Sequence, residues 1–529
     1  MMKSVFQRKN FPVITLIIIL LTNLYTIGYF HRWKKNEDGT RGVIRWDVIS
    51  YYGYLPAAVI HGDVSLDFIG EGKIKNDNKF WYVKLENGNR LIITTMGLSF
   101  LYAPFFFIAH ALAPLVGQAR DGFSNIYQLM LVVSGLFYAF MGLILLARFL
   151  RKHFDPLITA IVVLAVGLGT NLYYYSSLEA AMPHSHNFFL ITLFMTMVVL
   201  WYRNRHWVHG VAVGFLLGLI VLIRPTNVLL FLFFFLYGVT SWKKLWERVV
   251  FYVRKWHMVL IMIAAFLIPW IPQLLYWKEI TGEYLFYTYG EKNARFYFTH
   301  PHILESLFHI RKGWLVYTPV MAFALAGIPL LYRHSREWFF ALLFYVIAMI
   351  YVQSSWWCWW FGGGFGLRAY ISMYPLLAFP MAVLLKALWD RRKRTGFIIV
   401  SSVIVLLVAY QIFQTRQFTT TAIHYSATTT GSYCENFLKT YPTGPSWKML
   451  EVPDFNLARL GIYVAYPTSE DKDTWRNMEK ADAYARIREE IHTDRKVKRQ
   501  IRRYAEREDI PVDSAMQMVL DRMYDRKTN

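Results

Sequence analysis

The sequence has few charged residues for its length. Asp, Glu, Lys and Arg make up 17% of its 529 residues, whereas hydrophobic residues make up 55% and the mean hydropathy is +0.28. Soluble globular domains carry about 25% charged residues. The composition therefore excludes a water-soluble fold and indicates an all-α polytopic membrane protein.

Cysteine and acidic residues are also scarce. The two cysteines, Cys358 and Cys434, exclude a disulfide framework, a cysteine-rich zinc site and an iron–sulfur cluster, although one bridge between them stays open. The net charge is +22, but the basic residues lie between apolar segments and in the C-terminal tail. The positive-inside rule and lipid headgroups explain that placement, so we expect membrane lipids and no nucleic acid as partners.

Apolar runs dominate the chain up to residue 413. Most are about 17 to 25 residues long, which is enough for a helix to cross a bilayer. We expect a bundle of about eleven transmembrane helices. The runs fall near residues 11–30, 124–148, 156–175, 187–202, 208–223, 226–240, 257–277, 313–331, 337–353, 368–387 and 395–413.

A further apolar run, 91–117, is interrupted by Pro104 and Pro114. If it does not cross, the basic loops all fall on one side, which must be cytoplasmic. We therefore expect 91–117 to be a re-entrant or interfacial element on the external side. The basic clusters are Lys3/Arg8/Lys9, Arg148/Arg151/Lys152, Arg203/Arg205, Lys243/Lys244/Arg248/Arg254/Lys255, Arg333/Arg336 and Arg391/Arg392/Lys393/Arg394.

This topology predicts two domains. We expect residues 1–413 to form a transmembrane domain and residues 414–529 to form an external C-terminal extension, mixed at first and then helical. The external face is built mainly from the loops 31–90, 176–186, 278–312 and 354–368.

The first external loop contains Asp47 in the stretch Arg-Trp-Asp-Val-Ile-Ser-Tyr-Tyr. An ionised carboxylate beside aromatic residues at a membrane surface contributes little to structure, whereas it suits catalysis. We expect residues 47–60 to form a short interfacial helix that ends at Gly62, with Asp47 as its N-cap. The N-cap role and a catalytic role are compatible.

The second external loop places Glu179, His184 and His186 close together. Two imidazoles and a carboxylate could bind a divalent metal, but their spacing matches no tight zinc signature. We favour polar lining of a substrate cavity.

Three cations are candidates for binding an anion. Arg224 lies in a turn between two apolar runs, Lys312 at an external helix start, and Arg368 at the end of a Trp/Gly-rich loop. The N-terminus of a helix carries a partial positive charge and free backbone N–H groups, so it favours a bound phosphate. Contact with lipid headgroups is the alternative for all three, and a cluster of backbone carbonyls is a further alternative for Arg224.

The Trp/Gly-rich loop contains Trp357 and Trp360. Its tryptophans suit either an interfacial aromatic belt or a surface that binds a sugar or a prenyl chain. Its glycines do not form a nucleotide loop, because no strand precedes them and no βαβ unit follows.

These features come in an order that resembles a known family. An external Asp follows helix one, then a proline-broken segment, a His/Glu-bearing loop, a Lys-Gly-Trp-Leu-Val-Tyr-Thr-Pro helix start and a Trp/Gly turn that ends in Arg. In that layout residues 1–413 resemble the multispanning GT-C glycosyltransferases. They are most similar to the bacterial members related to protein mannosyltransferases and aminoarabinose transferases.

The resemblance implies an inverting enzyme that moves a monosaccharide from a polyprenyl-phosphate carrier to a lipid, glycan or protein acceptor. It implies a bacterial inner membrane location, a periplasmic active site and Asp47 as general base. Arg224, Lys312 and Arg368 would then hold the donor phosphate. Many relatives pair two acidic residues where this chain has one, so no cofactor is assigned and a divalent metal stays open.

The alternative function is a transporter or flippase of a lipid-linked glycan intermediate, which also needs a cationic cavity. Transporters usually show repeated halves and broken helices near the midplane. No internal repeat is evident here, and the polar residues concentrate at one face. These features favour an enzyme, and a glycan polymerase or ligase that uses a polyprenyl diphosphate is the further enzymatic alternative.

Overall fold

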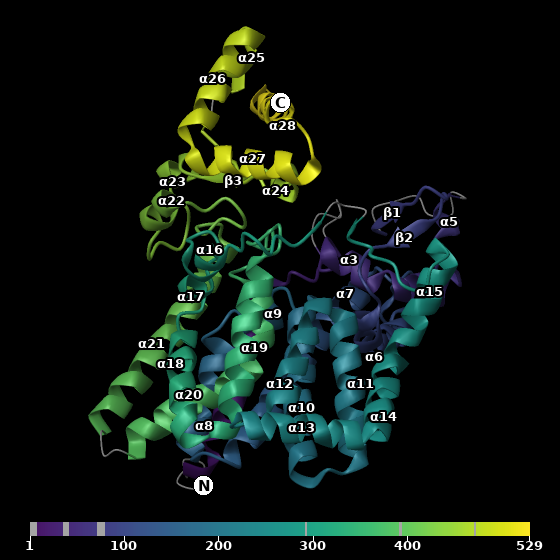
Figure 1. Cartoon of the computed structure of the whole chain (residues 1–529), viewed down its shortest axis with the longest axis vertical. Helices are drawn as coiled ribbons and strands as arrows, with labels where there is room; N and C mark the ends of the chain where they lie inside the picture. The colour runs from purple at the N-terminus through teal and green to yellow at the C-terminus, as the bar shows by residue number, and fades with distance from the viewer. Residues whose placement is uncertain are drawn as a thin grey trace. The chain divides into compact units, whose positions relative to one another are not determined.

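The computed structural model describes residues 8–34, 42–70, 80–290, 294–390, 394–469 and 472–528. Most of these residues are helical, and the strands among them form two small antiparallel sheets (Figure 1). β1 (Tyr82–Lys84) pairs with β2 (Arg90–Ile92), and β3 (Glu451–Pro453) pairs with β4 (Ala465–Pro467). The predicted all-α class is confirmed. Of the basic clusters, Lys3, Arg391, Arg392 and Lys393 lie outside the described residues.

The chain forms two compact units. The first comprises residues 1–288, 318–350 and 368–412, and the second comprises residues 289–317, 351–367 and 413–529. Residues 289–317 and 351–367 lie between apolar helices in the sequence, yet they belong to the same unit as the C-terminal part of the chain. The division at residue 413 stays a prediction.

Each of the eleven predicted apolar ranges contains a helix. Among the described residues, seven helices are long and apolar enough to cross a membrane, so the chain is a multi-pass membrane protein. The number of crossings stays a prediction, because several helices are shorter. The helices are α2 (Phe11–Phe30), α7 (Asn125–Arg151), α8 (Pro156–Leu168), α10 (Pro183–Asn204), α11 (Trp207–Ile223), α12 (Leu230–Leu236), α14 (Trp256–Leu267) with α15 (Ile271–Thr281), α18 (Met321–His334), α19 (Arg336–Ser354), α20 (Tyr374–Asp390) and α21 (Arg394–Thr419).

Glycines let helices of the first unit approach closely. A Cβ on Gly214 would lie 2.3 Å from the Met262 carbonyl oxygen, and one on Gly218 would lie 2.1 Å from that of Phe266. Both glycines lie on α11, four residues apart, and both carbonyls lie on α14. Small residues at this spacing are typical of helix pairs packed within membranes, where close backbone contact drives association.

A predicted basic loop folds into an amphipathic helix, α13 (Trp242–Arg254). The buried Arg248 fixes it, because its guanidinium donates to the carbonyls of Phe235 and Tyr237 at 2.9 and 2.8 Å. Trp242 and Trp246 are exposed on the helix. α13 lies crosswise to the neighbouring bundle helices (Figure 1), as helices in a membrane interface do.

The first external loop folds into short elements that carry Asp47. They include α3 (Asp47–Tyr52), α4 (Tyr54–Pro56), a π-helical turn (Ala57–His61) and α5 (Asp67–Gly70), followed by the β1–β2 hairpin and α6 (Gly97–Leu112). The predicted helix over 47–60 is confirmed in these pieces, and Gly62 ends it in the left-handed region at φ 66°. Its position in the membrane interface stays a prediction. The predicted N-cap is off by one residue, because Asp47 is the first helical residue and Trp46 precedes it.

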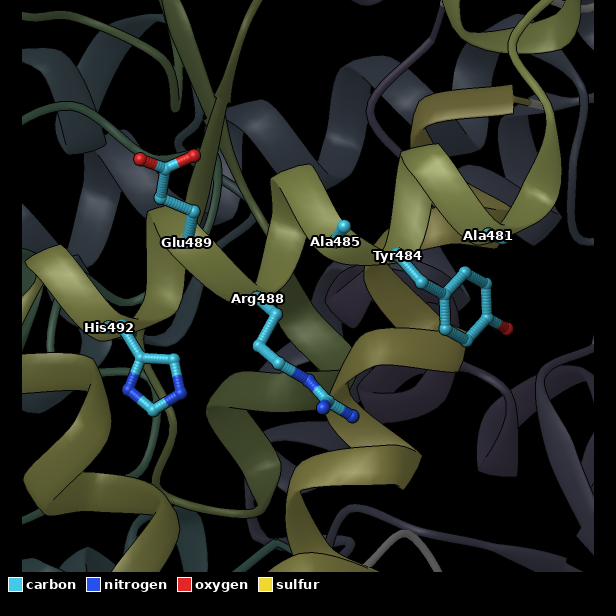
Figure 2. A pocket seen from close by; sticks show the side chains of 6 residues that line it. All are labelled: Ala481, Tyr484, Ala485, Arg488, Glu489 and His492. Carbon is cyan, nitrogen blue, oxygen red and sulfur yellow. The ribbon is translucent and has the colours of Figure 1, made fainter.

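The second unit is helical and has its own apolar core. The core is formed by residues such as Leu457, Ile462, Trp475, Ile487 and Ile501, all buried. Its helices are α16 (Ile303–Phe308), α17 (Trp314–Tyr317), α22 (Thr430–Glu435), α23 (Gly444–Lys448), α24 (Phe455–Arg459), α25 (Lys472–Arg476), α26 (Lys480–Thr493), α27 (Arg495–Glu508) and α28 (Val512–Thr528). A pocket in this unit is lined by residues of one helix, α26, between Ala481 and His492 (Figure 2).

Candidate functional site

Asp47 and Arg368 form an ion pair in the first unit. Nη2 of Arg368 lies 2.9 Å from Oδ2 of Asp47, and their side chains are 17% and 41% exposed. Asp47 begins α3, and Arg368 begins the 3₁₀ helix Arg368–Met373 that leads into α20. Two residues that the sequence singled out separately are thus in direct contact, at a place that solvent or a substrate can reach.

The helix that carries Asp47 rests on the start of α6. The hydroxyl of Ser99 donates to the carbonyl of Tyr51, and Thr94 Oγ1 lies 3.0 Å from Ser50 Oγ. The segment that precedes α6 is fixed in turn, because the Thr95 hydroxyl donates to the carbonyl of Leu222 at the end of α11. The predicted re-entrant segment therefore supports α3.

Trp46, directly before Asp47, has a strained backbone. Its φ of 51° and ψ of −135° lie outside the regions that residues with a side chain usually adopt, and its side chain is 73% exposed. Such strain costs about 1–3 kcal/mol and concentrates at functional sites. Here the turn carries the chain into α3 and leaves the Asp47 carboxylate in contact with Arg368 rather than with the helix N-terminus.

Arg224 and His184 form a second polar pair. Nη1 of Arg224 lies 3.3 Å from Nδ1 of His184. Because a guanidinium only donates, Nδ1 must accept, and the proton of the neutral imidazole is then on Nε2. Arg224 lies in the extended turn after α11, and His184 in the first turn of α10.

Charges from both pairs act on the Tyr51 hydroxyl. Burial raises its pKa, the positive charges of Arg224 and Arg368 lower it, and the negative charge of Asp47 raises it. Three charges that act on one buried hydroxyl must lie near it. Arg224 and Arg368 therefore lie in the same part of the first unit as Asp47, as an anion site would require.

Glu179 and His186 have other partners. Glu179 accepts a 3.1 Å hydrogen bond from the Tyr174 hydroxyl. His186 Nε2 lies 2.9 Å from Ser134 Oγ, and its ring packs edge-on against Tyr102. His186 is thus a buried packing residue, and its predicted place in a substrate cavity stays a prediction.

Among the residues that the structure describes, no set of side chains fits a divalent metal. The described part of the chain contains no group of three His, Cys, Asp or Glu side chains that could hold a metal ion. Asp47 is paired with a guanidinium instead, while Glu179 and the two histidines have partners on different elements.

Lys312, Trp357 and Trp360 belong to the second unit. The Lys312 ammonium is buried and donates to the carbonyls of Gly364 and Tyr425, the latter at 2.6 Å. Both tryptophans are buried in a cluster with Ala294, Cys358, Trp359 and Ala458. Their predicted roles toward a substrate stay predictions, and the structure gives all three residues contacts that hold this unit together.

Two polar residues that sequence analysis missed are Asn187 and Asn227. Both are fully buried, and neither amide has a hydrogen-bond partner among the described residues. Asn187 is three residues from His184, and Asn227 is three residues from Arg224. An asparagine inside an apolar run was the available signal, because polar residues there are costly and usually functional.

The chain was compared with known proteins. No protein-family model and no curated protein matches it. In structure it is similar to the archaeal oligosaccharyltransferase AglB from Archaeoglobus fulgidus in complex with an inhibitory peptide and a dolichol-phosphate, at 13% identity and a TM-score of 0.45, over 91% of this chain and 60% of that one. It is also similar to the Archaeoglobus fulgidus oligosaccharyltransferase in the apo form, at 14% identity and a TM-score of 0.45, over 83% and 61% of the two chains. This chain thus spans about three fifths of the length of those proteins.

Proposed function

We propose that this chain is a membrane glycosyltransferase that moves a monosaccharide from a polyprenyl-phosphate carrier to a hydroxyl group of a lipid, glycan or protein acceptor. The observation that carries the proposal is the 2.9 Å contact between Asp47 and Arg368 in a multi-pass membrane protein. This pair provides a group that takes a proton beside a group that holds a phosphate. Transfer from a lipid phosphate needs both.

In the proposed reaction the acceptor oxygen attacks the anomeric carbon of the donor. Asp47 takes the hydroxyl proton as the carbon–oxygen bond forms. The bond between the anomeric carbon and the phosphate oxygen breaks, and polyprenyl phosphate leaves with the electron pair. Attack opposite the leaving group inverts the anomeric configuration.

Arg368 and Arg224 stabilise the negative charge that develops on the leaving phosphate. Arg368 uses Nη2 for Asp47, and its Nη1 and Nε carry further N–H donors. It can therefore hold the phosphate and position Asp47 beside it at the same time. His184 accepts from Arg224 and so orients that guanidinium.

The basic clusters support a periplasmic position for this site in a bacterial inner membrane. If those clusters lie in the cytoplasm, Asp47, Arg224 and Arg368 lie at the opposite face. Nucleotide sugars do not reach that face, whereas a polyprenyl phosphate arrives through the lipid. We propose residues 1–413 as the catalytic domain and 414–529 as an external extension.

A reconstitution experiment tests the proposal. The purified chain in lipid nanodiscs is given undecaprenyl-phosphate-linked hexoses and a total extract of envelope lipids and glycans, and release of undecaprenyl phosphate is followed by mass spectrometry. Acceptor-dependent release that is lost in Asp47→Asn supports the enzyme. Movement of intact donor across liposomes without any release supports the flippase alternative instead.

A further inference from the structure

Three buried polar side chains of the first unit have atoms without hydrogen-bond partners. His184, Asn187 and Asn227 are 2%, 0% and 1% exposed. Within the described residues, His184 Nε2 and both amide atoms of each asparagine have no partner. Burying an amide without hydrogen bonds destabilises a folded protein, and buried polar groups are usually bonded. Such a group of side chains indicates a ligand.

These side chains lie on two elements that meet beside the cationic site. Asn187 follows His184 by three residues on α10, which places both on one helix face. Asn227 lies in the 3₁₀ turn Pro225–Leu229, which directly follows Arg224, and its backbone N–H donates to the Arg224 carbonyl at 2.9 Å. The 3.3 Å contact between Arg224 and His184 joins the two elements.

Other buried asparagines of this unit are bonded. Asn23 on α2 donates to the Ile19 carbonyl at 2.9 Å and accepts from the Ser176 hydroxyl at 2.8 Å. Asn171 accepts from the Tyr374 hydroxyl at 2.7 Å. These amides join helices, whereas Asn187 and Asn227 do not. A role as helix-to-helix contacts therefore does not explain them.

We propose that Asn187 and Asn227 bind the hydroxyl groups of the donor's sugar ring, an inference that rests on the glycosyltransferase function proposed above. An amide both donates and accepts hydrogen bonds, as a sugar hydroxyl does. A phosphate accepts only, so it suits the guanidinium groups of Arg224 and Arg368. The site thus has two parts. The guanidinium groups bind the phosphate, and the two amides bind the hydroxyl groups of the sugar.

If the two amides bind the sugar, their replacement should weaken donor binding without lowering the stability of the fold. Leucine has nearly the shape of asparagine and no polar atoms, so Asn187→Leu and Asn227→Leu should keep or raise the unfolding midpoint, because they remove an unbonded buried group. The matched control Asn23→Leu should lower the midpoint, because it breaks two hydrogen bonds. A site that binds a ligand at the expense of stability behaves in this way.

Binding is measured with two kinds of probe in nanodiscs: undecaprenyl phosphate, and undecaprenyl phosphate linked to glucose, galactose or mannose. In the wild type, at least one sugar-linked probe should bind more tightly than the bare phosphate. In both leucine variants that probe should bind about tenfold more weakly, the loss expected for hydrogen bonds to one amide. Binding of the bare phosphate should stay unchanged in the leucine variants and in Asn23→Leu.

Several outcomes would overturn the inference. It fails if the leucine variants bind the sugar-linked probes like the wild type, or if the wild type binds those probes no better than the bare phosphate. It also fails if the leucine variants and the corresponding alanine variants all unfold, because the amides would then be structural. A wild type that does not bind bare undecaprenyl phosphate removes the proposed function itself, which is a separate result.

Discussion

Arg368 and Asp47 are 321 positions apart in the sequence, yet Nη2 of the arginine lies 2.9 Å from Oδ2 of the aspartate. The pair joins the start of α3 to the start of the helical segment that leads into α20. A partly exposed ion pair of this kind contributes little to stability. Its expected effect is therefore on activity, and substitutions of the two residues separate that effect from folding.

Asp47→Asn should leave the fold intact and abolish transfer. The amide has nearly the shape of the carboxylate but cannot take a proton at neutral pH, a role worth roughly 10²- to 10⁴-fold in rate. Turnover in nanodiscs, together with the unfolding midpoint, checks this prediction. Wild-type turnover in a folded Asp47→Asn protein would remove Asp47 from the role of general base.

Arg368→Lys should weaken use of the donor although it keeps the positive charge. A guanidinium can bind Asp47 and a phosphate together, whereas an ammonium is a point charge on a flexible stem. Loss of a charge-assisted contact costs about 1.5–3 kcal/mol, or roughly 10- to 150-fold in kcat/KM for the donor. Kinetics against donor concentration measure the change, and an unaltered kcat/KM would contradict a phosphate-binding Arg368.

Gly218→Ala should destabilise the first unit. The added Cβ would lie 2.1 Å from the Phe266 carbonyl oxygen, so α11 and α14 must separate. Overpacking of this kind costs about 1–3 kcal/mol. The matched control is Gly28→Ala on α2, where nothing lies within 4 Å of the added Cβ. Denaturant unfolding of both variants in the same detergent gives the comparison, and equal midpoints would contradict close packing of α11 on α14.

The sequence predicted the helices well because apolar length and periodicity carry that information locally. It also singled out Asp47, Arg224 and Arg368 as candidates, since a charged side chain beside an apolar run is costly and is usually functional. It could not predict that Asp47 contacts Arg368. The two residues are 321 positions apart, so the contact depends on how the whole unit packs.

The burial of Trp357, Trp360 and Lys312 could not be predicted from the sequence either. The local pattern Trp-Trp-Cys-Trp-Trp is the same for an exposed belt and for a buried cluster, and packing with Phe455 and Tyr463 decides between them. Asn187 and Asn227 were missed because each is a single polar residue within or beside an apolar run.

The native cysteines provide a test of topology. Cys434 is exposed and Cys358 is buried, and both are free. If the basic loops are cytoplasmic, residue 434 is external, so an impermeant thiol reagent should label the wild type in intact cells but not Cys434→Ser. In that Cys434→Ser background, a cysteine at the exposed Thr395 should stay protected until the cells are opened. Labelling of Thr395→Cys from outside would contradict the cytoplasmic position of the basic loops, on which the interpretation of 91–117 as non-crossing depends.

The last prediction concerns the pH dependence of the second unit. Burial and, secondarily, the Lys312 charge lower the pKa of His424 to about 4. The imidazole is therefore neutral at pH 7, and its Nδ1 accepts the backbone N–H groups of Ser426 and Ala427 at 3.2 and 3.0 Å. A proton on Nδ1 would remove both hydrogen bonds.

Because the pKa of His424 in the folded chain lies below its ordinary value of 6.5, the unfolded chain binds more protons between pH 6.5 and pH 4. Stability should therefore be full above pH 6.5 and fall as the pH drops through this window. His424→Asn keeps an acceptor near the position of Nδ1 but does not titrate, so the unfolding midpoint of this variant should fall less steeply over the same range. Burial also lowers the pKa of His309, which leaves a residual slope. Tryptophan fluorescence during thermal unfolding at pH 7.5, 6, 5 and 4 measures both proteins, and parallel curves would show that His424 does not contribute to the acid sensitivity of this unit.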